Sequence, residues 1–167
     1  MRIRPEKKYD ANAIRKVHYY AFNDHPYTLK EDYKLIDLLR EKNALVASLV
    51  AEEPPLGIIG HLTISPIRIN EEKTNWFYLG PIGVLPEEQR KGVGKQLVKE
   101  AIRTMAALGA EGLVSRGDPK FFTQVGFRND SRLIFSKIQP EHSVLLPLSS
   151  NVPEGIITLD PVFSREL

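Results

Sequence analysis

The sequence predicts a single mixed α/β domain over residues 1–167, and three observations support this fold class. Segments with strand and helix periodicity alternate along the chain, and three of the β-prone segments follow one another as a meander. A chain of 167 residues with 42% hydrophobic residues is about the size of one domain and can bury a core. The sequence also contains no internal repeat, low-complexity tract or linker that would separate two domains.

The N-terminal part is predicted to contain a short strand and two helices. Residues 2–4 alternate in polarity as in a strand, and Asp10 can cap the helix that follows. A Thr-x-x-Glu capping box at residues 28–31 begins a second helical pattern, which continues to Leu39. Asp24, His25 and Pro26 form the predicted break between these two helices.

The meander is predicted from three β-prone segments. Residues 45–51 lead into a turn rich in Glu, Pro and Gly, and residues 58–64 run back, so the two segments form a hairpin. A second polar turn at residues 70–73 precedes a third strand over residues 76–84, which is rich in aromatic and branched residues.

The third strand contains an unusual pair, Gly80 and Pro81. Proline cannot donate a hydrogen bond to a sheet ladder, and glycine has no side chain to pack. We therefore expect a bulge at this pair, or a point at which strand pairing stops.

A long amphipathic helix and several short elements complete the chain. Apolar residues at steps of four run from Val93 to Met105, and Gly109 ends the helix. The remaining predictions are a short strand, a turn that begins a short helix, and two late strands, at residues 113–115, 117–119, 143–148 and 155–159.

The composition argues against several classes of function. The 23 Lys and Arg nearly balance the 21 Asp and Glu, so no strong field favours nucleic acid or an anionic membrane. The absence of cysteine excludes disulfide scaffolds, thiolate zinc sites and a cysteine nucleophile. The four histidines have no metal-ligand spacing, so we expect no metal. Neither a secretory leader nor a stretch of ~20 apolar residues is found, so we expect a cytoplasmic protein.

Residues 89–95 are the most informative segment. Two glycines at a helix start let the backbone approach a phosphate, and the first amides of a helix have no intrahelical partner. Arg90, Lys91 and Lys95 add positive charge. An ordinary loop with a solvated face is the alternative. The segment lacks the Gly-Lys-Ser/Thr ending of a P-loop and the acidic ribose partner of a dinucleotide site.

Residues 89–94 resemble the Gln/Arg-x-x-Gly-x-Gly/Ala motif of the GNAT acetyltransferases, at the head of a long helix after a bulged strand. Residues 79–84, residues 60–65 and the Gly-Asp-Pro to Gly-Phe segment at 117–127 also resemble the small bacterial members of that family. The resemblance covers most of the chain, roughly residues 1–167. It implies the GNAT-type acyl-CoA N-acyltransferase fold, a mixed, mostly antiparallel sheet splayed between its fourth and fifth strands and flanked by helices.

The resemblance also implies that acetyl-CoA is the co-substrate. The pantetheine arm would pair with the fourth strand, the amides at the helix start would hold the pyrophosphate, and Gln89 would brace the loop. The residues implied in binding acetyl-CoA are Ile82, Gly83, Val84, Gln89, Arg90, Lys91, Gly92, Val93, Gly94, Lys95 and Phe122.

Members of this family usually transfer acetyl directly to an amine, with the oxyanion held by an amide of the fourth strand, here Ile82 or Val84. A tyrosine often protonates the departing sulfur, four residues before a Gly-Phe pair. This chain has Phe122 at that position, and a phenyl ring cannot donate a proton. Another group or water would have to fill the role.

His61 and Tyr78 are the candidate catalytic residues. His61 has a suitable intrinsic pKa and lies on a strand next to the fourth, but a hydrogen-bonded structural histidine is the alternative. Tyr78 could line the acceptor pocket, and a core aromatic residue is the alternative. Residues 24–27 lie where this family builds its acceptor site.

Two functions are compatible with the sequence. The first is an N-acetyltransferase acting on an amine of a small molecule or peptide. The second is a non-catalytic acyl-CoA-binding or regulatory module, which Phe122 favours and which would keep the residues at 89–94. The acceptor, the exact acyl group and the oligomeric state stay open, although late strands that pair across a two-fold axis would be compatible with a homodimer.

Overall fold

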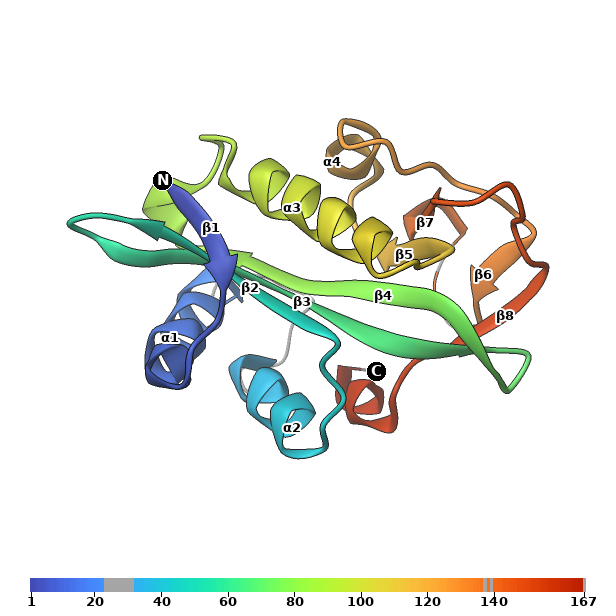
Figure 1. Cartoon of the computed structure of the whole chain (residues 1–167), viewed down its shortest axis with the longest axis horizontal. Coiled ribbons are helices and arrows are strands. Elements are labelled where there is room, and N and C mark those ends of the chain that lie inside the picture. Colours follow the sequence, from blue (N-terminus) through green and yellow to red (C-terminus); the bar gives the residue numbers. More distant parts are fainter. Residues whose placement is uncertain (23–31, 137, 139, 167) are drawn as a thin grey trace.

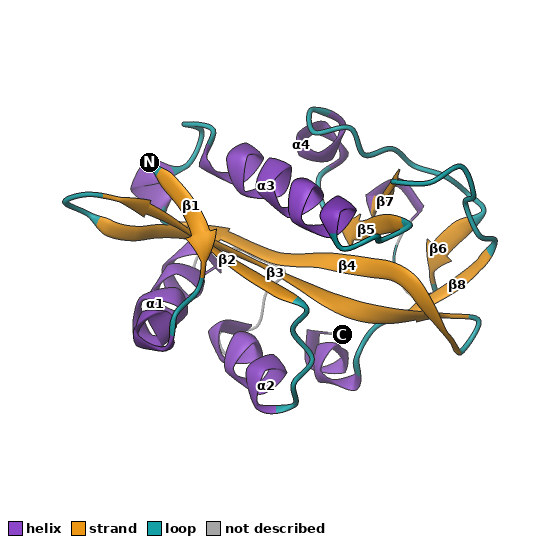
Figure 2. Cartoon of the chain, viewed as in Figure 1, coloured by secondary structure: helices purple, strands orange, loops and turns teal. Residues whose placement is uncertain are grey.

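The computed structural model describes residues 1–22, 32–136, 138 and 140–166, and it contains a mixed β-sheet with helices on both faces (Figures 1 and 2). The strands are β1 (Arg2–Pro5), β2 (Ala47–Glu53), β3 (Gly57–Ile69), β4 (Glu72–Val84), β5 (Gly112–Arg116), β6 (Leu133–Phe135), β7 (Ser143–Pro147) and β8 (Gly155–Thr158). The α-helices are α1 (Ala11–Phe22), α2 (Leu35–Glu41), α3 (Val93–Ala107) and α4 (Pro119–Thr123). The 3-10 helices are η1 (Lys8–Asp10), η2 (Asp32–Lys34), η3 (Pro86–Glu88), η4 (Pro140–His142) and η5 (Pro161–Glu166).

The strand order within the described residues is β1-β2-β3-β4-β5-β7, and β8 pairs with both β3 and β6. The pairs along the main path are antiparallel except β4 with β5, which are parallel. This arrangement confirms the predicted mixed, mostly antiparallel sheet. The sequence patterns missed β6, which is only three residues long, and placed the start of the third strand four residues late.

Strands β4 and β5 pair only over a short stretch before they separate. Their register joins Trp76 to Gly112, Phe77 to Leu113 and Tyr78 to Val114, and no later pair is formed between these two described strands. β5 continues beside β7 instead, as far as Arg116. The predicted separation of the fourth and fifth strands is therefore present, and it begins directly after Tyr78.

A bulge in β4 lies at the predicted pair. Leu62 on β3 faces Ile82, but Ile64 faces Leu79, so β4 contains one extra residue between these positions. Gly80 has φ +146°, a conformation that favours glycine, and its carbonyl accepts a hydrogen bond from Thr63 Oγ1 at 2.7 Å. The expected bulge at Gly80 and Pro81 is confirmed.

The bulge also reverses which side chains of β4 face each side of the sheet. Before it, Tyr78 packs in the core beneath α1 and α2, and Leu79 packs in the core beneath α3. Strict alternation would put Ile82 on the side of Tyr78, but the extra residue places Ile82 and Val84 against the α3 core. Gly83 consequently faces α1.

Candidate active site between the separated strands

A cavity of about 640 Å³ occupies the gap between β4 and β5, and we call it the wedge cavity. Its walls come from β4, the end of β5, α4 and the end of α1. The lining residues used below are Tyr78, Leu79, Gly80, Pro81, Ile82, Val84, Gln89, Ser115, Arg116, Asp118, Phe121, Phe122, Ile138 and His142. At the point where β4 and β5 separate, the buried Ser115 hydroxyl donates a hydrogen bond to the Leu79 carbonyl at 2.6 Å. This bond supplies the Leu79 carbonyl with a partner where strand pairing has stopped.

The backbone of β4 presents two residues to this cavity. The Leu85 amide donates a hydrogen bond to the Ile59 carbonyl on β3 at 2.9 Å. Hydrogen-bonded and non-hydrogen-bonded residue pairs alternate along an antiparallel ladder, so the backbone groups of Gly83 also point toward β3. The backbone groups of Ile82 and Val84 therefore point the other way, into the gap left by β5. Both residues line the wedge cavity, whereas Gly83 is not among its described lining residues.

A second cavity of about 620 Å³ adjoins the first at the start of α3, and we call it the cradle. The two cavities share the lining residues Val84, Gln89, Gly94, Asp118 and Phe121. The Gln89 side chain donates to the Val84 carbonyl at 3.0 Å, which ties the loop before α3 to the end of β4. Together the wedge cavity and the cradle form one extended slot.

The cradle lies between the loop before α3, the first turn of α3, and α4 with its flanking residues. Arg90 and Gly92 have φ values of +65° and +87°, and α3 begins at Val93, so the amides of its first turn have no intrahelical partner. A Cβ built on Gly92 would meet no atom within 4 Å, so the space in front of the helix is open. Such a turn favours an anion.

Charged side chains around the cradle are predominantly basic. Arg90, Lys95 and Lys120 line it, together with Asp118 and Glu88. Lys91 is not among the described lining residues, but its ammonium group pairs at 3.3 Å with the carboxylate of Glu88, which does line the cradle. The structure therefore brings together the predicted residues at 89, 90 and 92–95, and Lys91 contacts the cradle only through Glu88.

His61 lies in the core and not at either cavity. Its Nδ1 is 2.8 Å from Nε2 of His18, its Nε2 is 2.7 Å from the Ser48 hydroxyl, and its side chain is fully buried. Burial lowers the pKa of His18 to about 4, and burial with the nearby His18 keeps the pKa of His61 well below its usual range. This geometry favours the structural alternative for His61 over the role of a base.

The His18 ring explains the glycine at position 83. A Cβ on Gly83 would lie 2.9 Å from His18 Nδ1 and 3.0 Å from its Cε1, closer than side chains normally approach. Gly83→Ala is therefore expected to destabilise the protein by about 1–3 kcal/mol through overpacking. In a His18→Ala background, the loss of stability caused by Gly83→Ala should fall by at least half. Denaturant unfolding of the wild type, the two single variants and the double variant measures this. Strictly additive costs would contradict this contact.

The buried His18 also predicts how stability depends on pH. Its pKa in the folded protein, about 4, lies below the value near 6.5 in the unfolded chain, so the unfolded chain takes up the proton first. The neutral His18 ring contributes fully to the free energy of unfolding above pH 6.5. This contribution is lost as the pH falls toward 4, which lowers the free energy of unfolding by about 3 kcal/mol. Denaturant unfolding between pH 7 and pH 4 tests this. His18→Leu should make the dependence less steep, while the buried His61 still contributes to it, and an unchanged slope in that variant would contradict the prediction.

Tyr78 and Phe122 both line the wedge cavity. Tyr78 is buried, its hydroxyl accepts a hydrogen bond from Arg116 Nε at 2.9 Å, and its ring packs edge-on against Phe163 with centroids 5.2 Å apart. Phe122 packs against Phe121 and Phe127. Tyr78 is thus both a core aromatic and a wall of the cavity.

Sequence reasoning missed Ser115 and Arg116, which stand where β5 leaves β4. A signal was available, because the carboxyl ends of parallel strands are where α/β sheets place their ligands. The predicted acceptor segment at residues 24–27 and the capping box at 28–31 lie outside the described residues. Among those described, no three His, Cys, Asp or Glu side chains gather to hold a metal ion, and no helix is long and apolar enough to cross a membrane.

The chain was compared with family models, with known proteins and with solved structures. Residues 11–127 match the model of the acetyltransferase (GNAT) family. The uncharacterized N-acetyltransferase YhbS of Escherichia coli K12 is 31% identical over 94 residues, and the match spans 56% of this chain and 56% of that relative. A GNAT family acetyltransferase from Brucella melitensis, solved in complex with acetyl-CoA, aligns with a TM-score of 0.86 and 31% identity over 97% of both chains. The Escherichia coli YhbS structure in complex with CoA aligns with a TM-score of 0.89 and 25% identity, over 98% of this chain and 92% of that one.

Proposed function

The chain belongs to the GNAT acetyltransferase family, and on this basis we propose that it transfers the acetyl group of acetyl-CoA to an amine by direct attack. One observation carries the proposal. The edge of β4 that β5 leaves after Tyr78 adjoins the open start of α3, and together they form a single slot. The strand edge can pair with an extended arm, and the amides at the start of α3 can bind a pyrophosphate. Two structural neighbours that align over nearly the whole chain were solved with acetyl-CoA or CoA.

The slot fits the chemistry of acetyl-CoA. The amides at the start of α3, with Arg90 and Lys95, would hold the pyrophosphate, and Lys120 adds charge nearby. The pantetheine arm would lie along Ile82 and Val84, and Phe122 would form part of the apolar wall beside the thioester. Gly83 has no direct part in this proposal, since its backbone faces β3.

In the proposed reaction, the neutral amine nitrogen attacks the thioester carbon and a new C–N bond forms. The carbonyl oxygen becomes negative and accepts a hydrogen bond from the Ile82 amide, which points into the wedge cavity. The C–S bond then breaks. The nitrogen loses one proton, the thiolate sulfur gains one, and the products are an amide and free CoA.

Tyr78 is our candidate for the proton donor, since Phe122 cannot serve. Its phenol oxygen accepts a hydrogen bond from Arg116, so the hydroxyl proton can be directed to another acceptor such as the thiolate. The other hydroxyl at the gap, Ser115, already donates to the Leu79 carbonyl. His142 is a further titratable group on the cavity wall and provides a control.

An assay of acetyl-CoA consumption across a panel of amines tests the proposed function. Release of free CoA thiol with any amine supports an N-acetyltransferase. The second candidate is the non-catalytic acyl-CoA-binding module, which the phenylalanine at position 122 favours. Tight binding of acetyl-CoA by calorimetry, without thiol release for any amine, would overturn the enzyme and support the module.

A further inference from the structure

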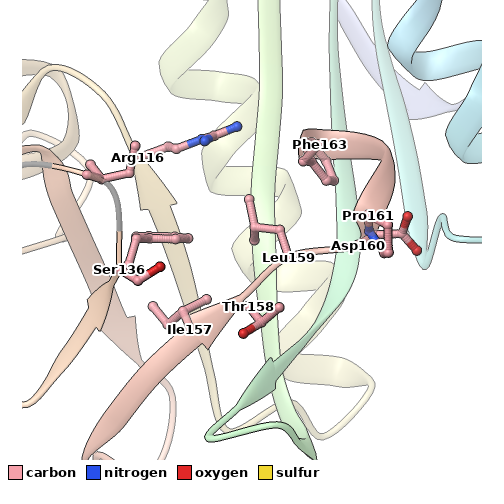
Figure 3. A pocket seen from close by; sticks show the side chains of 10 residues that line it. Arg116, Ser136, Ile157, Thr158, Leu159, Asp160, Pro161 and Phe163 are labelled. Atoms are coloured by element: carbon pink, nitrogen blue, oxygen red, sulfur yellow. The ribbon is translucent and has the colours of Figure 1, made fainter. Parts of the chain in front are cut away.

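A smaller cavity of about 270 Å³ shares lining residues with the wedge cavity, and we call it the side chamber. Figure 3 shows the side chains that line it. It is formed by the end of β6, by β8 and by the turn that leads into η5. Arg116 and Ile138 line both cavities, so the two spaces adjoin at these residues. The side chamber is therefore next to the place where the amine and the thioester would meet.

The walls of the side chamber are mainly apolar. Phe135, Ile157, Leu159 and Phe163 line it, and Phe135 and Phe163 also pack against the Tyr78 ring. A space with such walls favours an apolar group, because burying that group releases ordered water at little polar cost.

Two of the polar side chains at its edge have partners within the protein. The Asp160 carboxylate accepts the Val162 amide at 2.9 Å, and Thr158 Oγ1 is 3.1 Å from Glu71 Oε1. Arg116 extends across the chamber toward Phe163, with its guanidinium 5.9 Å from the centre of that ring (Figure 3). A second ammonium group placed among the apolar walls would lose its hydration, and this loss costs free energy.

The size of the side chamber limits what can enter it. Its volume is just below the range of roughly 300–1,000 Å³ that is typical of small-molecule pockets. A single ring or a branched aliphatic group matches this volume, whereas an extended peptide would need a longer groove.

We infer that the acceptor is a small monoamine with a compact apolar body, which occupies the side chamber while the amine reaches past Arg116 to the thioester. This inference rests on the proposed acetyl transfer and narrows it to one substrate class. It excludes diamines, polyamines and peptide amines as preferred acceptors.

The test compares thiol release with phenethylamine, isoamylamine, spermidine and a lysine-containing peptide. The wild-type protein should show a kcat/KM at least about tenfold higher for the two apolar monoamines than for the others. Leu159→Asp should raise the KM for the monoamines by about tenfold and reduce the preference over spermidine, while the KM for acetyl-CoA stays unchanged. Leu159→Met is the matched control and should behave as wild type.

A second variant keeps the test valid if Leu159→Asp does not fold. Ser136 is exposed at the chamber, so Ser136→Trp should fill the space without disturbing the core and should also raise the KM for the monoamines alone. Thiol release that prefers spermidine or the peptide, or monoamine kinetics unchanged in both variants, would overturn the inference and leave the acetyltransferase standing. Absence of thiol release with every amine would overturn both.

Discussion

Gly92→Asp is expected to weaken acetyl-CoA binding by on the order of a hundredfold while the protein stays folded. Gly92 precedes the first turn of α3, and a side chain built there enters open space in the cradle. A carboxylate at this point would face the pyrophosphate and cancel the attraction of the helix start. Calorimetric titration with acetyl-CoA measures the loss, and thermal unfolding checks the fold.

Gly92→Asn separates charge from backbone conformation. Asparagine has nearly the shape of aspartate and tolerates a positive φ, which Gly92 adopts at +87°. The asparagine variant should bind acetyl-CoA within a few-fold of wild type. Equal losses in both variants would assign the effect to shape, and wild-type affinity in Gly92→Asp would show that the pyrophosphate lies elsewhere.

Tyr78→Phe is expected to lower kcat by about 10²–10³ with little change in acetyl-CoA affinity. The substitution removes the one hydroxyl that we assign to protonating the thiolate, and it keeps the ring that packs against Phe163. Steady-state kinetics with an accepted amine, together with acetyl-CoA calorimetry, measure the two quantities. A selective fall in kcat distinguishes a catalytic hydroxyl from a packing role, because a packing defect would also alter binding and stability.

Two further variants sharpen this test. His142→Gln removes another titratable side chain from the wedge cavity and should leave kcat unchanged. Phe122→Tyr, made in the Tyr78→Phe background, places a hydroxyl on the same cavity wall and should restore part of the lost activity. Full activity in Tyr78→Phe, or an equal loss in His142→Gln, would contradict the assignment of Tyr78.

Local chemistry explains what could be predicted from the sequence. Proline cannot pair within a ladder, so Gly80 and Pro81 indicated the bulge from two residues alone. Likewise, the helix pattern that begins at Val93, preceded by glycine and basic residues, indicated an open helix start. Both features depend only on residues that are neighbours in the sequence, so the sequence alone indicates them.

Other features depend on contacts between distant parts of the chain. The position of Gly83 follows from the extra residue in β4, which changes the alternation by one and cannot be placed without the register against β3. His61 is buried against His18, which lies 43 residues earlier, and no sequence pattern indicates that contact. The side chamber joins β6, β8 and η5 around Arg116, so it exists only after the sheet has formed.

We expect the β4 edge at Ile82 and Val84 to be open until acetyl-CoA pairs with it. Amide hydrogen exchange followed by NMR, with and without acetyl-CoA, distinguishes an open edge from a paired one. The amides of Ile82 and Val84 should exchange rapidly in the free protein and become protected on addition of acetyl-CoA, while the Gly83 amide is protected in both states. Protection of the Ile82 and Val84 amides before the ligand is added, or no change in their exchange when acetyl-CoA binds, would show that the pantetheine arm does not pair with this edge.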